Sequence, residues 1–199
     1  MAQTYLHTMF GPRARALQEA AGSRASYAKK EADAGPVDIL TDREIVFIAA
    51  RDSFYMASVS EDGWPYVQHR GGPRGFLRRI AGNRIGFADY RGNRQYLSAA
   101  NLAHDDRVSL FLMDYPNRRR LKLIGHAWAS EDPADIAALM DPDYAAEPER
   151  AFLIDVKGYD WNCSQHITPR FTEAEIRRDT QPLPDEPAGL RAASSTWKD

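Results

Sequence analysis

Arginine and glycine residues meet in the stretch YVQHRGGPRGFL, residues 66–77, in a pattern that could bind an anion. Arg70 comes directly before Gly71 and Gly72, which have no side chains to keep another group away from the backbone amides. A cation at such a strand end predicts a site for a negatively charged group. Taken alone, the tripeptide Gly71-Gly72-Pro73 favours a simple turn with a solvated arginine. An RNA-binding role is disfavoured, because RGG-type segments of that kind are repeated and disordered.

A second segment of the same kind is FADYRGNRQYLSAANL, residues 87–102. Strand-like residues give way to Gly92 and Asn93, and a helix is predicted to begin there with Asn93 as its N-cap. Free amides at a helix start attract an anion, and Arg94 adds a full positive charge. The alternative is that Arg94 is only a surface cation. A cation in the first turn of a helix opposes the helix dipole, however, and this unfavourable placement favours a bound anion.

A third group of cations lies in PNRRRLKLIGHAW, residues 116–128. Alternation along a strand would place Arg120 and Lys122 on one face, with Leu121 on the other. Arg118 and Arg119 fit a solvated hairpin loop. Arg120, at the start of the strand, fits a surface cation and a residue of the binding site equally well. Three separated segments therefore each offer a cation, and a single phosphate could gather some of them.

A fourth segment, GYDWNCSQHITPRF, combines an aromatic surface with neutral hydrogen-bonding groups. A ring-shaped molecule could pack against Trp161 and be positioned by Asn162, Gln165 and His166, and His166 could exchange a proton near neutral pH. Alternatively, Trp161 fills the core and His166 caps a turn. Cys163 and His166 have half of a zinc-site spacing, but no second cysteine exists, so we expect no metal. Cys163 fits a small buried residue better than a nucleophile.

The elements that must position these residues are mostly strands. Asp62-Gly63 predicts a tight hairpin within residues 53–70, and further strands are expected over 75–80, 84–90, 107–115, 120–129 and 149–159. Helices are expected over 42–51, after a capping box of Thr41 and Glu44, and after Asn93, Asp132 and Thr172. Helices are too few to alternate with the strands, so the pattern predicts a barrel or sandwich, mainly β with flanking helices.

Composition limits the class of protein. The 199 residues include 26 Lys and Arg against 28 Asp and Glu, a net charge of -2, which gives no support for nucleic acid or membrane partners. With one cysteine and no signal-peptide or membrane-spanning run, we expect a soluble, cytoplasmic protein. We expect an N-terminal arm over 1–40 with one short helix at 13–21, a main domain over 41–180 and a loosely ordered tail over 181–199.

In this order, the segments SFYMASVSEDGWPYVQHRGGPRGFL, DYRGNRQYLSAANL, RVSLFLMDY and RRRLKLIGHA resemble the pyridoxamine 5'-phosphate oxidase-related family of FMN-binding split barrels. The resemblance covers nearly half of the chain, and DWNCSQHITPRF is similar to a segment found in one branch of these flavoproteins. It implies a homodimer of six-stranded Greek-key split β-barrels that binds two FMN molecules between its subunits.

The resemblance also assigns residues. Arg70 matches the family arginine on the strand leading into the site, and Asn93 and Arg94 fall where the oxidases have a basic pair facing the FMN phosphate. Arg120 falls near a glutamine that contacts the flavin. The predicted cofactor-binding residues are Arg70, Gly71, Asp89, Asn93, Arg94, Gln95, Arg120, Trp161 and Gln165, and His166 is the candidate catalytic residue.

The activity that this implies is an FMN-dependent oxidoreductase acting on an unidentified small molecule. Pyridoxamine or pyridoxine 5'-phosphate oxidation itself is disfavoured, because the closing arginine and histidine segment that holds the substrate phosphate in those enzymes is not found. The resemblance is also compatible with a deazaflavin-dependent reductase or a non-catalytic flavin-binding protein, since family membership does not transfer a reaction.

Overall fold

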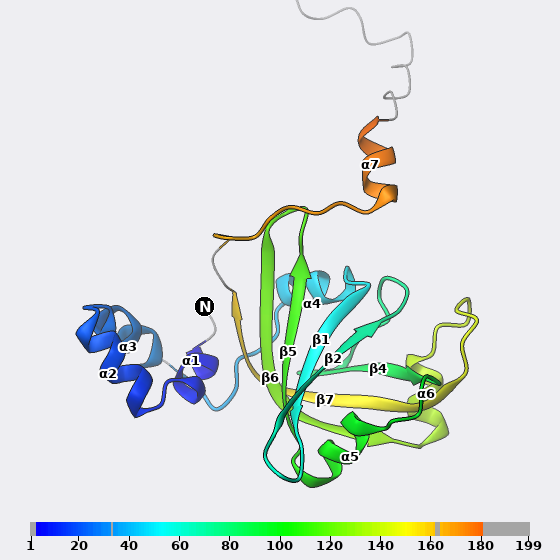
Figure 1. The fold of residues 1–199 in the computed structure, drawn as a ribbon, viewed down its shortest axis with the longest axis horizontal. Helices are drawn as coiled ribbons and strands as arrows, with labels where there is room; N and C mark the ends of the chain where they lie inside the picture. Colours follow the sequence, from blue (N-terminus) through cyan, green and yellow to red (C-terminus); the bar gives the residue numbers. More distant parts are fainter. Residues whose placement is uncertain (1–2, 33, 162–163, 181–199) are drawn as a thin grey trace, which may run out of the picture.

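Seven antiparallel strands form one strongly curved sheet in the computed structural model, which describes residues 3–32, 34–161 and 164–180. The order is β2-β1-β5-β6-β7-β4-β3. The strands are β1 (Ser53–Val59), β2 (Pro65–Gly71), β3 (Arg78–Ala81), β4 (Arg84–Tyr90), β5 (Arg107–Asp114), β6 (Arg119–Ser130) and β7 (Pro148–Trp161). Figure 1 shows β4 and β7 lying across β1 and β5, so that the sheet curls into a barrel. Its edge strands β2 and β3 do not pair with each other, and the described barrel stays open.

The count of six strands that the resemblance implies is wrong, because the sheet has seven; β3, at the edge beside β4, corresponds to the strand expected over residues 75–80. β3 is only four residues long and begins at Arg78, after Phe76 and Leu77 have entered the core. The hairpin expected at Asp62-Gly63 is confirmed, with Gly63 at a φ of +81° between β1 and β2. The alternation expected for residues 107–115 is also confirmed. Every second side chain of β5 is buried, as a strand with one face on a core requires.

β7 is the strand that joins the two halves of the barrel. It pairs with β6 along one edge, where Leu121 faces Trp161, and with β4 along the other, where Asp89 faces Arg150. The beginning of β7 therefore lies beside the end of β4. The last residue of β7 lies at the opposite end of this 14-residue strand.

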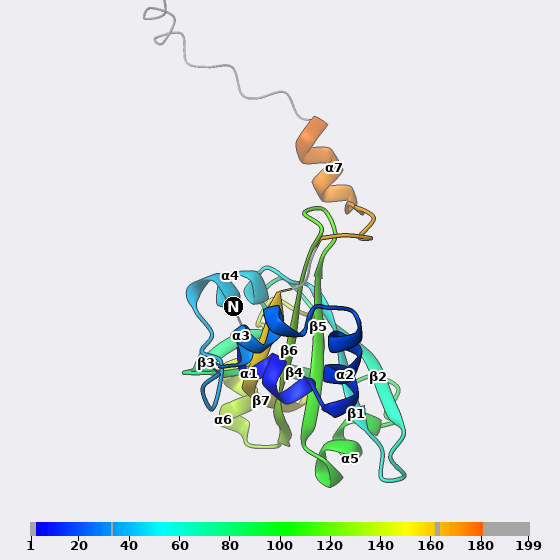
Figure 2. The same ribbon diagram turned by 90° about the vertical axis from the view of Figure 1, so that its left-hand side faces the viewer.

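Three helices precede the barrel, whereas the sequence predicted one short helix over residues 13–21. They are α1 (Gln3–Met9), α2 (Pro12–Ala20) and α3 (Arg24–Ala32), and they lie together at one side of the barrel (Figures 1 and 2). Long-range contacts stabilise the two that were missed. Tyr5 of α1 is buried in the core, and the Asp38 carboxylate accepts hydrogen bonds from the Thr4 and Tyr5 amides. In α3, buried Glu31 pairs with Arg15.

The other helices follow their predicted signals more closely. These are α4 (Asp42–Ala49), α5 (Leu97–His104), α6 (Pro133–Leu139) and α7 (Glu173–Thr180). The capping pair of Thr41 and Glu44 lies at the start of α4, the Asp132 side chain caps α6, and the pair of Thr172 and Glu175 lies at the start of α7. In Figure 2, α7 lies beyond the turn between β5 and β6. Within the described residues, no helix combines the length and apolar character needed to cross a bilayer. The tail over 181–199 lies outside the described residues.

Candidate functional site

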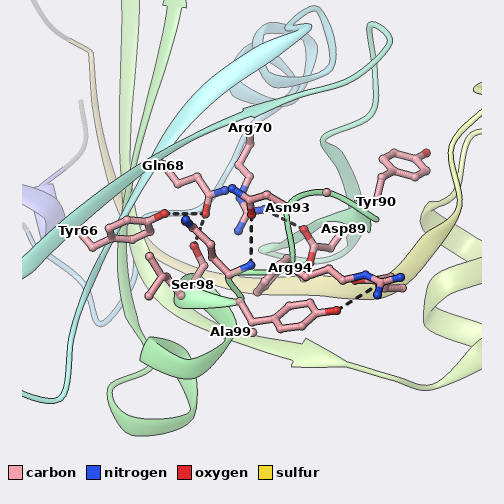
Figure 3. A pocket seen from close by; sticks show the side chains of 15 residues that line it. Tyr66, Gln68, Arg70, Asp89, Tyr90, Asn93, Arg94, Ser98 and Ala99 are labelled. Carbon is pink, nitrogen blue, oxygen red and sulfur yellow. Dashed lines mark hydrogen bonds and ion pairs between the residues drawn. The ribbon is translucent and has the colours of Figure 1, made fainter.

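A pocket opens where the barrel is split, between β2, β4 and the segment leading into α5 (Figure 3). Its walls come from three parts of the chain that are distant in sequence. The lining residues are Tyr66, Gln68, Arg70, Asp89, Tyr90, Gly92, Asn93, Arg94, Gln95, Tyr96, Leu97, Ser98, Ala99, Glu149 and Phe152.

One ion pair spans the split at the base of this pocket. Nη1 of Arg70 on β2 donates to Oδ1 of Asp89 on β4 at 2.8 Å, although the two strands are not neighbours in the sheet. The Arg70 guanidinium lies 4.9 Å from the centre of the Phe152 ring, and its side chain is only 12% exposed. Its Nε–H group is buried without a hydrogen-bond acceptor. Buried donors are nearly always paired, so an unpaired donor marks a place where a further acceptor is expected.

Burial shifts the pKa of both members of the pair toward their neutral forms. It lowers the pKa of Arg70 and raises the pKa of Asp89, although each charge partly offsets the shift of the other. A third charge belongs to the same cluster, since Nε of Arg150 on β7 lies 3.5 Å from Oδ2 of Asp89. Two guanidinium groups therefore share the Asp89 carboxylate, and Arg150 also lies 3.6 Å from Glu149.

Arg150 was missed by sequence reasoning. Its position follows from the pairing of β7 with β4, which places Arg150 opposite Asp89, and a strand register of this kind depends on tertiary structure. One signal was present in the chain. Arg150 precedes the apolar run Ala-Phe-Leu-Ile on a strand expected to be buried, where a charged side chain usually has a partner.

The loop before α5 differs from its prediction, because the helix begins at Leu97 rather than after Asn93. Asn93 is therefore not the N-cap. Its Oδ1 accepts a hydrogen bond from the Gln95 amide at 3.2 Å and so stabilises the loop locally. Arg94 and Tyr96 both have positive φ values, +60° and +53°. Such non-glycine residues cost about 1–3 kcal/mol each and cluster at functional sites.

Neutral polar groups cover the wall of the pocket beside α5. Oε1 of Gln68 accepts hydrogen bonds from the Tyr66 hydroxyl at 3.2 Å and from the Ser98 hydroxyl at 2.9 Å, as Figure 3 shows. These three residues were not predicted. Tyr66, Gln68 and Arg70 alternate along β2 and so share one face of that strand, which is the period-2 signal that could have found them.

The structure brings five predicted residues together in the pocket: Arg70, Asp89, Asn93, Arg94 and Gln95. Gly71 ends β2 and lines an adjoining hollow with His69 and Tyr90. Gly72 makes room for a side chain of the same protein rather than for a ligand. A Cβ atom at Gly72 would lie 2.8 Å from Cγ of Phe76.

Four other predicted residues line neither this pocket nor the adjoining hollow. Arg120 pairs with Met113 and shares the outer face of the sheet with Lys122, and its Nε is buried without a partner. Trp161 packs edge-on against Phe47 and donates its Nε1–H to Glu44 at 2.7 Å, as expected if it fills the core. The other two are Gln165 and His166, which lie in an exposed turn after β7, with His166 at a φ of +60°. Residues 162 and 163 lie outside the described residues.

The fold and the split pocket define the class of protein. Residues 40–157, more than half of the chain, match the family described as Pyridoxamine 5'-phosphate oxidase, and the protein belongs to this family. The chain is similar to HupZ from Group A Streptococcus, with 10% sequence identity and a TM-score of 0.51, over 66% of this chain and 100% of HupZ. That likeness supports the fold alone.

Two further solved structures show weaker similarity. A Clostridium acetobutylicum protein, related to a Bacillus subtilis general stress protein and assigned to the pyridoxinephosphate oxidase family, is 12% identical, with a TM-score of 0.45 over 69% of this chain and 99% of its own. An FMN-binding protein from Syntrophomonas wolfei is 10% identical, with a TM-score of 0.46 over 73% of this chain and 97% of its own. No curated protein matches the chain.

Proposed function

We propose that the split pocket holds the phosphate of FMN and that the protein is an FMN-dependent oxidoreductase acting on a small molecule. Its membership of a family of flavin-related proteins supports this proposal. The observation that carries it is the Arg70 Nε–H group, which is buried at the base of the pocket without an acceptor. A phosphate oxygen is an acceptor of the right charge for it.

The residues of the pocket fit a phosphate ester of a polar chain. Arg70 supplies charge at the base and Arg94 supplies charge at the rim, on a loop whose backbone conformation is strained. The hydroxyl and amide groups of Tyr66, Gln68 and Ser98 form a neutral wall that suits the hydroxyls of the ribityl chain. Arg70 and Arg94 would hold the phosphate, and Tyr66, Gln68 and Ser98 would bind the ribityl hydroxyls.

When bound, FMN supplies hydride or electron transfer, and the protein orients it and limits access. Arg120, Gln165 and His166 do not line the pocket of their own chain. If they contact the flavin, as the family resemblance implies, they do so in the site of a second copy, with FMN bound between the subunits of a homodimer. The outer face of the sheet carries exposed apolar side chains suited to such an interface, including Tyr55 and Val67.

In this arrangement His166 would exchange a proton with the substrate, and Arg120 would place positive charge near the flavin ring. The His166→Ala variant should keep its melting temperature and FMN occupancy while flavin reduction or reoxidation slows. A fall of both quantities would assign His166 a structural role instead.

The identity of the co-purifying molecule tests the proposal. We expect a yellow protein that releases FMN by mass spectrometry and rebinds it in a titration of the stripped protein at neutral pH. A released deazaflavin would favour the deazaflavin-dependent reductase, and no binding of FMN would reject the proposal. Assays with pyridoxamine and pyridoxine 5'-phosphate test the oxidase activity. Bound FMN that no donor reduces would favour a non-catalytic flavin-binding protein.

A further inference from the structure

We propose that Asp89 is a resident counter-ion that competes with the incoming phosphate for Arg70 and so limits how tightly the pocket binds it. This inference rests on the proposed function, because it takes the phosphate of FMN as the physiological anion. It gives Asp89 a role opposite to that of a cofactor ligand. A carboxylate repels a phosphate, so its presence at the base of an anion site needs an explanation.

The geometry of the cluster supports competition. Asp89 uses one oxygen for Arg70, at 2.8 Å, and directs the other toward Arg150, at 3.5 Å. Its side chain is 16% exposed, so little water is available to solvate the charge. The carboxylate thus lies where it neutralises Arg70 in the absence of another anion. A buried guanidinium with no counter-charge would be strongly destabilising.

Arg150 allows Asp89 to release Arg70 without becoming an unpaired buried charge. Arg150 faces the other carboxylate oxygen of Asp89, its guanidinium lies 4.6 Å from the centre of the Tyr96 ring, and its own Nε is buried without a hydrogen bond. A phosphate could therefore take Arg70 while Asp89 remains paired with Arg150. Glu149 also lies near Arg150, at 3.6 Å, but it already has Arg91 as a partner at 3.1 Å.

A second ion pair, between β4 and β7, has no such features and supplies a matched control. Arg84 on β4 binds Asp155 on β7 through two hydrogen bonds of 2.7 and 3.0 Å. Both of these side chains are substantially exposed, and neither residue lines the split pocket. Removal of the Asp155 charge changes the net charge of the protein as removal of the Asp89 charge does, without altering the pocket.

The test compares Asp89→Asn with Asp155→Asn in titrations of the stripped protein with FMN, riboflavin and inorganic phosphate. Removal of the competing charge should tighten FMN and phosphate binding by about tenfold in Asp89→Asn. Riboflavin binding should stay as in the wild type, and Asp155→Asn should leave all three affinities unchanged. Unchanged or weaker phosphate binding in a folded Asp89→Asn protein would overturn the inference.

The double variant Asp89→Asn/Arg150→Gln covers the case in which Asp89→Asn does not fold, because it removes one charge of each sign. It should bind phosphate at least as tightly as the wild type, and weaker binding would again overturn the inference. The ligands also separate the two proposals. If the wild type does not bind FMN but Asp89→Asn still binds inorganic phosphate more tightly than the wild type does, the proposed cofactor is rejected and the competing role of Asp89 is supported.

Discussion

Two carboxylates with little solvent exposure, those of Glu44 and Asp89, differ in how their partners are satisfied. Glu44 on α4 is 2% exposed, and both of its oxygens accept hydrogen bonds, from the Thr41 backbone amide and from Nε1 of Trp161. Asp89, at the split, faces two guanidinium groups whose Nε–H groups have no acceptor. Burial raises the pKa of both carboxyls. The hydrogen bonds from Thr41 and Trp161 reverse that shift for Glu44, whereas the pKa of Asp89 stays raised.

The difference distinguishes a structural cluster from a binding cluster. At the Glu44 junction the Thr41 and Trp161 donors have their acceptor, so a ligand could add nothing to them. At the split, the Nε–H donors of Arg70 and Arg150 lack an acceptor and a pocket lies beside them. Satisfied buried polar groups stabilise a fold, and unsatisfied ones mark a place where a further group is expected.

The largest effect should follow from truncation of Trp161, the aromatic member of the structural cluster. Trp161→Ala removes a ring packed on Phe47 and leaves an oxygen of Glu44 without its donor. We expect a loss of about 3–5 kcal/mol in the free energy of unfolding, measured by denaturant titration. Trp64→Ala, at a side chain that is 74% exposed, is the control and should be near neutral. A stable Trp161→Ala protein with lost FMN affinity would mean that Trp161 belongs to the binding site instead.

A smaller effect, on affinity alone, should follow from Arg94→Ala. Loss of a charge-assisted hydrogen bond to the phosphate should weaken FMN binding by about 1.5 kcal/mol, roughly tenfold in affinity, in a fluorescence titration. Riboflavin has no phosphate and should bind as before. Arg118→Ala is a close control, because Arg118 is also exposed and has a positive φ, +51°. Equal losses for the two ligands would show that Arg94 acts on the loop or the flavin ring.

The smallest effect that we predict is a pH dependence of stability from Glu44. Its pKa in the folded protein lies below the usual value of 4.5, so the folded state favours the charged form. The resulting stabilisation is present above pH 4.5 and is lost as the pH falls through the folded pKa. Thermal unfolding at several acidic pH values should therefore show a steeper loss of stability for the wild type than for Glu44→Gln. Identical slopes would contradict the assignment of Glu44.

Local signals in the sequence were enough to predict most of the strands and part of the site. Strict alternation in residues 107–114 and the Asp62-Gly63 turn are encoded within a few residues, and so are the capping pairs of α4 and α7. Arg70, Asn93 and Arg94 were found because glycines beside cations are a local pattern. Arg150 was not, because it meets Asp89 only through the register of β7 on β4. The N-terminal helices depend on partners such as Asp38 and Glu31, which are also distant from the residues they bind.

The most direct test of the split pocket as the FMN phosphate site is the effect of Arg70→Ala on the ratio of riboflavin to FMN dissociation constants. The ratio should fall by one to two decades, because the lost charged hydrogen bond is worth about 1.5–3 kcal/mol and only FMN makes it. Riboflavin affinity and the fold, checked by circular dichroism, should be retained. An unchanged ratio, with wild-type FMN affinity in a folded Arg70→Ala protein, would place the phosphate elsewhere and contradict the proposed site.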